Sequence, residues 1–305
     1  MIIVAVLFRI CAGLIFCWAT LGSAAEVNQR ILVITAHAGD YLIGAGGMLA
    51  GLIDQGREVT VIQVTNDEKN SDGLDPAETQ KANREEGRQA ARLLGAREVV
   101  GLGHKSGELG YISSTELRSE IFGLIRYFKP QVMVIPDPYI HYDENRDHFY
   151  AGKMAEEAWG YSGGGMFGPE LERMGLQPYG APEVYYYAIG RPYRPGEGGD
   201  EPARFRPVDI SATFDRKLRA VLALRTTNRL YAAETRRRLT DAGHADPRLT
   251  QMNDKSIDAL VRAYLEELAS AIGKKHGFRY GEEFNYVGGA RGLPEHVLEK
   301  IRPHR

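Results

Sequence analysis

The stretch RILVITAHAGDY at residues 30–41 decides the fold of this chain. Residues 30–35 form a short apolar run with several β-branched side chains, which is typical of a buried strand in a parallel sheet. His37 and Asp40 follow this run directly. In α/β proteins ligands bind beyond the carboxyl ends of such strands. The stretch therefore predicts a central strand and, at its end, a place where polar side chains gather.

The same alternation continues through the first half of the chain. We expect further strands at residues 59–64, 98–102 and 131–135. Helices are expected between the strands at residues 46–55, 78–94 and 115–128. Strands that alternate with helices form a mainly parallel sheet with helices on both faces, which is an α/β fold. With right-handed crossovers and the strand order 3-2-1-4, the sheet reverses direction between its first and fourth strands.

The second half of the chain is less regular. Residues 160–203 are rich in Gly, Pro and aromatic side chains and contain one expected strand at 183–189. Loops of this kind either wall a site or connect elements at the surface. Helices return at residues 215–224 and 254–272, and the basic residues 236–238 suggest a solvated helix face. No internal repeat divides the chain, so we expect one domain at residues 26–305.

The N-terminal segment differs from the rest of the chain. Residues 1–22 are apolar apart from Arg9 and Thr20, and three small residues at 23–25 precede Glu26. This pattern predicts a signal peptide at residues 1–25, cleaved before Glu26. The run after Arg9 has about 13 mostly apolar residues, fewer than the ~20 of a spanning helix. We therefore expect an exported protein, periplasmic or secreted, without a stable membrane span after cleavage.

Charge and cysteine content narrow the possible chemistry. The chain has 38 basic and 40 acidic residues, a net charge of −2. No strong field then draws it to nucleic acid. Both cysteines, Cys11 and Cys17, lie in the expected signal peptide. The mature chain would have no disulfide, no cysteine nucleophile and no thiolate ligand.

Polar side chains follow the first and fourth expected strands, which flank the reversal of the sheet. His37 and Asp40 follow the first, and the sequence DENRDH at residues 143–148 follows the fourth. Two imidazoles and one carboxylate with an open fourth position are the ligand set of a catalytic zinc site. We therefore predict a zinc site, or another divalent metal site, at His37, Asp40 and His148. Asp147 is expected to orient a ligand ring from outside the ligand set.

These residues and their neighbours also allow other interpretations than a metal site. A histidine at a strand end is often a satisfied polar residue, and Asp40 alone is compatible with a helix N-cap. The glycines at residues 44–47 lack the third glycine of a dinucleotide-binding loop, because residue 49 is Leu. Ser106 and Ser162 lack the G-x-S-x-G setting of a hydrolase nucleophile. The joint placement of the His37 and His148 segments favours the metal site.

The motifs AHAGDYLIGAGG at residues 36–47 and NRDH at 145–148 resemble the PIG-L/LmbE family of zinc-dependent de-N-acetylases. Weaker matches lie at residues 84–86, 208–211, 217–218 and 280–284. The resemblance implies a Rossmann-like, three-layer LmbE-like fold, a zinc ion, and a small-molecule substrate that is carbohydrate-like. It also implies His37, Asp40 and His148 as the zinc ligands and Arg84 in substrate binding.

The chain departs from the family motif at three positions. The family's general base, the first Asp of H-P-D-D, is replaced by Gly39, and the first histidine of H-P-D-H is replaced by Asn145. The final acid of the first motif is Tyr41. Three residues are candidates to supply the lost groups: Glu68 as base, His141 in the space of the missing histidine, and Asn145 as a neutral hydrogen-bond donor to a carbonyl.

The resemblance implies a zinc-dependent hydrolase that removes an acyl group from an N-acylated amino sugar or a similar small amide. Two alternatives remain open at the level of the sequence. A branch of the family hydrates unsaturated oxo-acids and also lacks the first Asp of the motif, which makes a zinc-dependent hydratase the first alternative. A family member without catalytic activity is the second.

Overall fold

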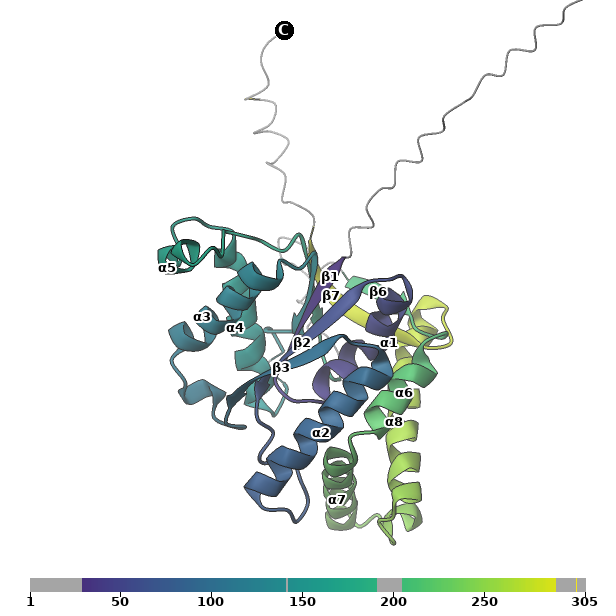
Figure 1. Cartoon of the computed structure of the whole chain (residues 1–305). Coiled ribbons are helices and arrows are strands. Elements are labelled where there is room, and N and C mark those ends of the chain that lie inside the picture. Colours follow the sequence, from purple (N-terminus) through teal and green to yellow (C-terminus); the bar gives the residue numbers. More distant parts are fainter. Residues whose placement is uncertain (1–28, 141, 191–204, 289–299, 301–305) are drawn as a thin grey trace, which may run out of the picture.

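A seven-stranded sheet in the order β3-β2-β1-β4-β5-β7-β6 is the centre of the molecule (Figure 1). The computed structural model describes residues 29–140, 142–190 and 205–288, together with residue 300. The strands are β1 (Arg30–Thr35), β2 (Glu58–Thr65), β3 (Glu98–His104), β4 (Val132–Pro136), β5 (Glu183–Tyr187), β6 (Phe205–Asp209) and β7 (Gly281–Gly288). β1 to β5 are parallel, and β7 pairs antiparallel with β5 and β6. The predicted α/β class and the order 3-2-1-4 are confirmed.

Helices cover both faces of the sheet (Figure 1). On one face lie α1 (Asp40–Asp54), α2 (Pro76–Leu94), α6 (Phe214–Leu222), α7 (Arg225–Asp241) and α8 (Asp254–His276). On the other lie α3 (Ser114–Phe128) and α4 (Arg146–Ser162), followed by the short α5 (Pro169–Arg173). Short 3₁₀ turns are η1 (Leu109–Tyr111) and η2 (Pro247–Leu249). The molecule is therefore a three-layer α/β structure, as predicted.

Strand β1 is buried on both faces, which explains its continuous apolar sequence. Ile31 and Val33 pack into the core under α1, whereas Leu32 and Ile34 pack into the core under α3 and α4. Alternate side chains of a strand point to opposite faces, so a strand between two helical layers needs apolar residues throughout. β1 thus forms a rigid base for the residues that follow it.

Helix α1 begins at Asp40, six residues before the predicted start at residue 46. Its N-cap is Gly39, which has no side chain to hydrogen-bond the first turn. The usual sequence signal of a helix start, a capping Ser, Thr, Asp or Asn, is therefore missing. The correction places Asp40 in the first turn of a helix instead of in a loop.

Helix α4 was not predicted, and the segment around His148 was expected to be a loop. The helix contains Gly152 and Gly160, which lower its intrinsic helical propensity. Gly152 packs so closely on β4 that an added Cβ would lie 2.4 Å from the Pro136 carbonyl oxygen. Tertiary packing thus requires a residue that local propensity disfavours. His148 lies in the first turn of this helix.

Strands β6 and β7 were also not predicted from the sequence. β7 contains Glu282 and Glu283, which argue against a buried strand when the sequence is considered alone. In the fold, the carboxylate of Glu282 accepts the N–H groups of Gly47 and Met48 and pairs with the Lys217 ammonium at 2.8 Å. β6 contains Pro207, which lacks a backbone donor and is tolerated at the edge of a sheet.

The described part of the Gly-rich segment lies away from the switch point of the sheet. α4 runs from the carboxyl edge back to the amino edge, and the chain crosses this edge before β5 begins. The buried guanidinium of Arg126 holds the crossing by donating to five carbonyl oxygens, those of Ser162, Gly164, Phe167, Gly168 and Leu176. The segment was expected either to wall a site or to connect elements at the surface, and residues 163–177 fit the surface connection.

Several predictions from the sequence concern residues outside the described ranges. These are the signal peptide at residues 1–25, His141, and residues 191–203 of the Gly-rich segment. Among the helices that the structure describes, none is long and apolar enough to cross a membrane.

Candidate metal centre

Three buried side chains converge at the carboxyl edge of the sheet, between β1 and β4. His37 follows β1, Asp40 opens α1, and His148 lies in the first turn of α4. His37 Nδ1 lies 3.2 Å from Asp40 Oδ2 and 3.3 Å from His148 Nε2. His148 Nε2 lies 3.4 Å from Asp40 Oδ2. The structure therefore brings together the three residues that the sequence singled out as ligands.

The spacing of these three atoms fits a small divalent ion. A regular tetrahedron with an edge of about 3.3 Å has a centre about 2.0 Å from each corner, which is the zinc–nitrogen and zinc–oxygen bond length. The three contacts of 3.2, 3.3 and 3.4 Å form one nearly equilateral face of such a tetrahedron. Two imidazole nitrogens and one carboxylate oxygen are also the donor types of catalytic zinc sites.

Hydrogen bonds within the turn after β1 fix the direction of His37. The Asp40 carboxylate accepts the His37 backbone N–H at 2.7 Å, and the Thr35 hydroxyl donates to the His37 carbonyl at 2.7 Å. The Thr65 hydroxyl, from the neighbouring strand β2, donates to the Ala36 carbonyl at 2.8 Å. The backbone of the turn is thus held on several sides before any ion is considered.

A second carboxylate holds the outer nitrogen of each imidazole. Asp147 Oδ2 lies 3.4 Å from His37 Nε2, and Asp143 Oδ2 lies 2.7 Å from His148 Nδ1. Carboxylates in this position fix the tautomer and the orientation of a metal-binding histidine. Asp147 also accepts the backbone N–H groups of Gly107 and Leu109. The sequence indicated Asp147 but not Asp143, because nothing in its spacing marked it out among the acids of residues 143–147.

Asp67 is a further residue at this centre that the sequence did not indicate. It follows β2, is 1% exposed, and its Oδ2 accepts the Ala38 backbone N–H at 2.9 Å. Burial raises the pKa of Asp67, and the nearby His37 opposes this rise. The sequence pointed instead to its neighbour Glu68, since both are acids at the carboxyl end of the same strand.

The carboxylates control the protonation of both histidines. Burial alone lowers the pKa of His148, but Asp40 and Asp143 outweigh burial and raise it to about 9. Burial likewise opposes the charged form of His37, whereas Asp40 and Asp147 raise its pKa well above 6.5. Burial raises the pKa of Asp40, and the two histidines more than reverse this, leaving it well below 3.8. A metal ion binding here competes with a bound proton.

The other predicted site residues lie as follows. Glu68 is half-buried, and its carboxylate accepts a hydrogen bond from Asn66 Nδ2 at 2.8 Å. Asn145 is exposed and caps α4, because its side-chain oxygen accepts the Asp147 N–H at 3.1 Å. Arg84 is exposed on α2. None of the hydrogen bonds found for these described residues joins them to His37, Asp40 or His148.

Gly39 and Tyr41, where the chain departs from the family motif, are both buried. A Cβ added at Gly39 would lie 3.0 Å from Leu224 Cδ1, so a side chain at this position requires Leu224 to move. The Tyr41 side chain is 1% exposed, and burial raises the pKa of its hydroxyl. Apolar packing therefore surrounds the position at which the family carries its general base.

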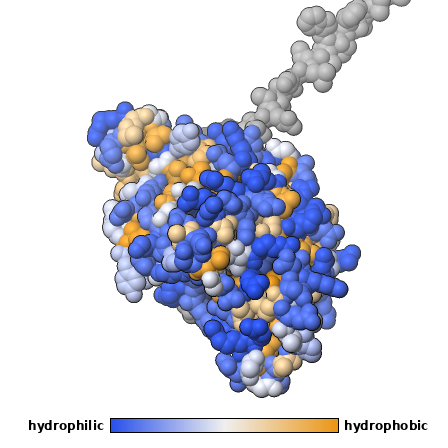
Figure 2. Space-filling model, turned by 60° about the horizontal axis from the view of Figure 1, so that its bottom comes forward, coloured by the Kyte–Doolittle hydropathy of each residue, from blue (hydrophilic) through white to orange (hydrophobic). Residues whose placement is uncertain are grey.

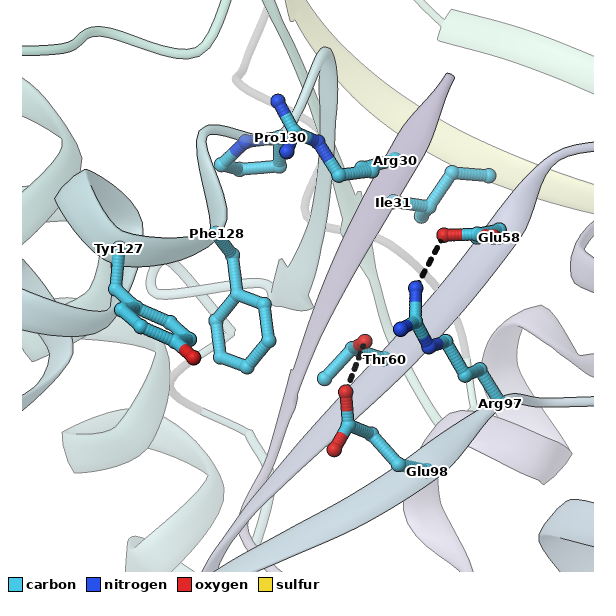
Figure 3. Close-up of a pocket in the computed structure, with 9 residues that line it drawn as sticks. All are labelled: Arg30, Ile31, Glu58, Thr60, Arg97, Glu98, Tyr127, Phe128 and Pro130. Atoms are coloured by element: carbon cyan, nitrogen blue, oxygen red, sulfur yellow. Dashed lines mark hydrogen bonds and ion pairs between the residues drawn. The ribbon is translucent and has the colours of Figure 1, made fainter. Parts of the chain in front are cut away.

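A separate hollow of about 420 Å³ lies at the opposite, amino edge of the sheet (Figure 3). The aromatic rings of Tyr127 and Phe128 face an ion pair between Arg97 and Glu58 across it. It begins at Arg30, where β1 starts, whereas His37 lies beyond the other end of β1. This hollow and the cluster of ligands are thus different places, and the chemistry of the side chains identifies the site.

Comparisons with known proteins agree with this geometry. Residues 32–159 match the model of the PIG-L family, described as GlcNAc-PI de-N-acetylase. A diacetylchitobiose deacetylase from Thermococcus kodakarensis is 27% identical over 263 residues, which are 86% of this chain and 84% of that protein. A 4-oxalmesaconate hydratase from Pseudomonas putida is 26% identical over 225 residues, 68% of this chain and 78% of that protein.

A solved structure shares the fold over most of the chain. It is the N,N'-diacetylchitobiose deacetylase from Pyrococcus horikoshii, complexed with its inhibitor MPG. The similarity has a TM-score of 0.68 at 26% identity and covers 90% of this chain and 87% of that chain. The relatives thus include deacetylases and, at greater distance, a hydratase.

Proposed function

We propose that this chain, whose residues 32–159 match the PIG-L family model, is a zinc-dependent hydrolase. Its reaction is the removal of an acyl group from an N-acylated amino sugar or a similar small amide. The observation that carries the proposal is the nearly equilateral triangle of His37 Nδ1, Asp40 Oδ2 and His148 Nε2, with sides of 3.2–3.4 Å. The deacetylase relatives support the choice of reaction.

The residues present can hold the ion and keep the rings of its two histidine ligands oriented toward it. A zinc ion at His37, Asp40 and His148 would supply a water of pKa near ~7 and a Lewis acid for the acyl carbonyl. Asp143 Oδ2 lies 2.7 Å from the outer nitrogen of His148, and Asp147 Oδ2 lies 3.4 Å from that of His37, so the inner nitrogens are left to bind the metal. Another divalent metal would use the same residues.

Gly39 leaves the position of the usual general base without a carboxylate, and such a base is typically worth ~10²–10⁴ in rate. The carboxylates of Asp67 and Asp143 already accept hydrogen bonds from Ala38 and His148, and that of Asp147 accepts the backbone N–H groups of Gly107 and Leu109. We therefore keep Glu68, in the loop after β2, as the proposed base. Asn145 and His141 remain proposals for contacts to the acyl carbonyl, and Arg84 for substrate binding.

The charges of the centre favour an amide over an oxo-acid as substrate. Four carboxylates, those of Asp40, Asp67, Asp143 and Asp147, surround the two histidines. They exceed the charge of one divalent ion, and like charges repel strongly in a buried site. A neutral N-acyl sugar that yields an ammonium product suits this environment better than a substrate with several carboxylates. The largely hydrophilic face at the carboxyl edge also suits a polar substrate (Figure 2).

The proposal is tested by loading the purified protein with zinc and offering a panel of N-acetylated amino sugars. We expect acetate release that depends on added zinc and is absent in the His148→Ala variant. The proposal would be refuted if wild type released no more acetate than this variant on every substrate of the panel.

The hydratase alternative is supported by Gly39 and by the hydratase relative. It is tested with conjugated dienoate oxo-acids, whose ultraviolet absorbance falls when water adds across a double bond. We expect no loss of absorbance with the zinc-loaded protein. A zinc-dependent loss, with no acetate release from sugars, would replace the hydrolase proposal by this one.

We further propose that the protein is exported, to the periplasm or outside the cell, because residues 1–25 have the pattern of a signal peptide. Expression of the full chain in a bacterium with fractionation of the cells tests this. We expect the exported form to begin at Glu26 when its N-terminus is sequenced. Full-length protein confined to the cytosol would refute export.

A further inference from the structure

Asp67 occupies an unusual position for a loop carboxylate. Its side chain is 1% exposed, and its backbone has a φ of 56°, in the left-handed region that side chains other than Gly rarely adopt. Strained conformations of this kind persist where the surroundings over-determine them, and they cluster at functional sites. The contacts of Asp67 show what this conformation achieves.

Four donors converge on the Asp67 carboxylate. Its Oδ2 accepts the Ala38 backbone N–H at 2.9 Å and Gln63 Nε2 at 3.1 Å. Its Oδ1 accepts the Thr65 hydroxyl at 3.1 Å and Asn70 Nδ2 at 3.2 Å. Both oxygens are thus engaged with protein groups, which suits a carboxylate that holds structure and leaves little capacity to accept a proton from substrate.

The bond to Ala38 completes a clamp on one peptide unit. The carbonyl of His37 and the N–H of Ala38 belong to the same planar peptide group. Thr35 Oγ1 donates to that carbonyl at 2.7 Å, and Asp67 Oδ2 accepts that N–H at 2.9 Å. The peptide plane after His37 is therefore fixed at both ends. Its orientation sets the backbone of His37 and with it the direction of the imidazole.

The clamp is itself anchored to the helical layer. The buried Asn83 of α2 donates from Nδ2 to the carbonyls of Asp67 and Asn70, both at 3.0 Å. Thr227 of α7 donates to Asn83 Oδ1 at 3.3 Å. These bonds hold the loop after β2 in the conformation with positive φ. The position of Asp67 is thus determined by α2 and α7 as well as by its own strand.

We propose that Asp67 is a positioning residue of the metal centre, which aims His37 Nδ1 at the ion by clamping the His37–Ala38 peptide from the Ala38 side. The inference rests on the proposed function only in that a divalent ion occupies the centre. It assigns Asp67 no contact with substrate and no step in the reaction.

The test compares the zinc affinity of metal-free wild type and Asp67→Asn by competition with a chromophoric chelator. The Asn side chain keeps only one acceptor oxygen. If this oxygen faces Ala38, the new NH₂ group faces the donors Thr65 and Asn70; if it faces those donors, the NH₂ group faces the Ala38 N–H. Either orientation loses part of the four-donor arrangement. We expect zinc to bind ~10–100-fold more weakly, the usual effect of losing an outer partner of a ligand. The visible absorption of the Co²⁺-loaded variant should change as well, because it reports the geometry of the ligands.

The matched control is Asp72→Asn, which makes the same chemical change in the same loop. The Asp72 side chain is 47% exposed and lies 4.0 Å from Arg229, away from the clamp. We expect its zinc affinity to stay within twofold of wild type. A tenfold loss in this control would mean that charge in the loop, and not the clamp, sets the affinity, and would overturn the inference.

Circular dichroism and thermal melting of the metal-free proteins separate positioning from folding. A folded Asp67→Asn variant with wild-type zinc affinity and cobalt spectrum would refute the positioning role, whatever its melting temperature. If Asp67→Asn does not fold, Thr35→Val tests the other end of the clamp, with the same expected loss and the same refuting outcome. Absence of zinc binding by wild type would overturn the proposed function together with this inference, whereas equal binding by the variants overturns this inference alone.

Discussion

Each histidine of the centre is held by carboxylates on both of its ring nitrogens. Asp40 lies beside the inner nitrogens, Asp147 beside the outer nitrogen of His37, and Asp143 beside that of His148. The contact between Asp143 and His148 is the shorter, at 2.7 Å against 3.4 Å. The arrangement predicts that both Asp143 and Asp147 contribute to the zinc affinity of the centre.

We expect Asp143→Asn and Asp147→Asn to weaken zinc binding by ~10–100-fold each, because both remove an acceptor that fixes a ligand ring. Chelator competition with the purified metal-free variants measures the effect. Glu144→Gln is the control, since Glu144 is exposed and lies 3.5 Å from Arg238 of α7. Unchanged affinity in both Asp variants would contradict the assignment of these carboxylates to ring orientation.

Zinc uptake should release protons at neutral pH. Burial lowers the pKa of His148, but Asp40 and Asp143 overcome it and raise the pKa to about 9. The imidazole is therefore protonated at pH 7 in the metal-free fold and must lose its proton to bind an ion. Apparent zinc affinity should rise with pH through the range in which His148 and His37 lose their protons. Calorimetry in two buffers of different ionisation enthalpy measures the release, and a value of zero at pH 7 would contradict it.

The same shift makes the metal-free protein less stable at high pH. The folded-state pKa of His148, about 9, lies above the ordinary value of 6.5. The stabilisation by the bound proton is then fully present below pH 6.5 and is lost as the pH rises through 9. Melting curves of metal-free protein at pH 6 and pH 9.5 test this sign, and His148→Gln should show a smaller difference, because the pKa of His37 is raised as well.

At the residue scale, the sequence indicated the side chains that share a motif and missed those that depend on a turn. His37 and Asp40 follow β1, His148 lies in the segment after β4, and the two strands are neighbours in the parallel part of the sheet. Asp67 and Glu68 are adjacent acids, and the backbone conformation of Asp67 turns its carboxylate toward Ala38. No local pattern encodes that conformation, because contacts from α2 maintain it.

At the scale of elements, Gly152 controls the distance between α4 and β4. A Cβ at this position would lie 2.4 Å from the Pro136 carbonyl oxygen and 3.1 Å from its carbon. These are backbone atoms, so Gly152→Ala must push the helix away from the strand, at a cost of ~1–3 kcal/mol for overpacking. Chemical denaturation measures the loss. Zinc affinity should fall too, because His148 lies one turn earlier on the same helix.

Gly160→Ala is the matched control for this substitution. Gly160 lies in the same helix, is exposed, and has no atom within 4 Å of an added Cβ. Alanine is favoured over glycine in helices by ~0.5–1 kcal/mol, so this variant should be slightly more stable than wild type. Its zinc affinity should be unchanged. Equal effects of the two substitutions would show that the contact with Pro136 does not restrict α4.

Two glycines, Gly152 and Gly39, explain which helices were missed or misplaced in the prediction from the sequence. Strands and helices of the first half follow clear apolar periodicity, and β1 was predicted with its observed bounds. α4 escaped prediction because Gly152 satisfies a tertiary contact at the expense of local propensity. α1 was expected too late because Gly39 carries no capping side chain. Both glycines lie close in the sequence to a residue of the metal centre, Gly39 to Asp40 and Gly152 to His148.

At the scale of the whole molecule, a buried ion pair joins distant parts of the chain. Lys217 of α6 and Glu282 of β7 are 2% and 3% exposed and lie 2.8 Å apart. Lys217 also donates to the Ile43 carbonyl of α1, and Glu282 accepts the N–H groups of Gly47 and Met48 in the same helix. The pair thus connects the helix that carries Asp40 to the C-terminal half of the sheet.

Lys217→Met should destabilise the fold by about 3–5 kcal/mol, because it leaves the Glu282 carboxylate buried without its cation. Adding Glu282→Gln should cost much less than the same change made alone, since the two sites share one interaction. Urea denaturation of wild type, both single variants and the double variant gives the coupling energy. Strictly additive effects would contradict the pairing. Arg237→Gln, at an exposed position of α7, provides a control expected near wild-type stability.

The overall architecture was predictable where successive elements are neighbours in space. The order 3-2-1-4 follows from βαβ units with right-handed crossovers, and the structure confirms it. The last strands were not predictable in this way. β7 inserts between β5 and β6 and pairs antiparallel with both across long stretches of chain, and its charged residues are explained only by partners such as Lys217. Long-range pairing of this kind leaves little local signal.

The position of the three ligands along the chain also sets a time order for assembly. His37 and His148 are 111 residues apart, and they meet only when β4 has docked against β1. A growing chain that ends before α4 displays just two of the three ligands, so the ion cannot serve as an early nucleus for folding. Contacts this distant form late, after the loop between them has closed. In a refolding experiment, capture of zinc should therefore follow formation of the sheet and mark the moment at which its two halves have joined.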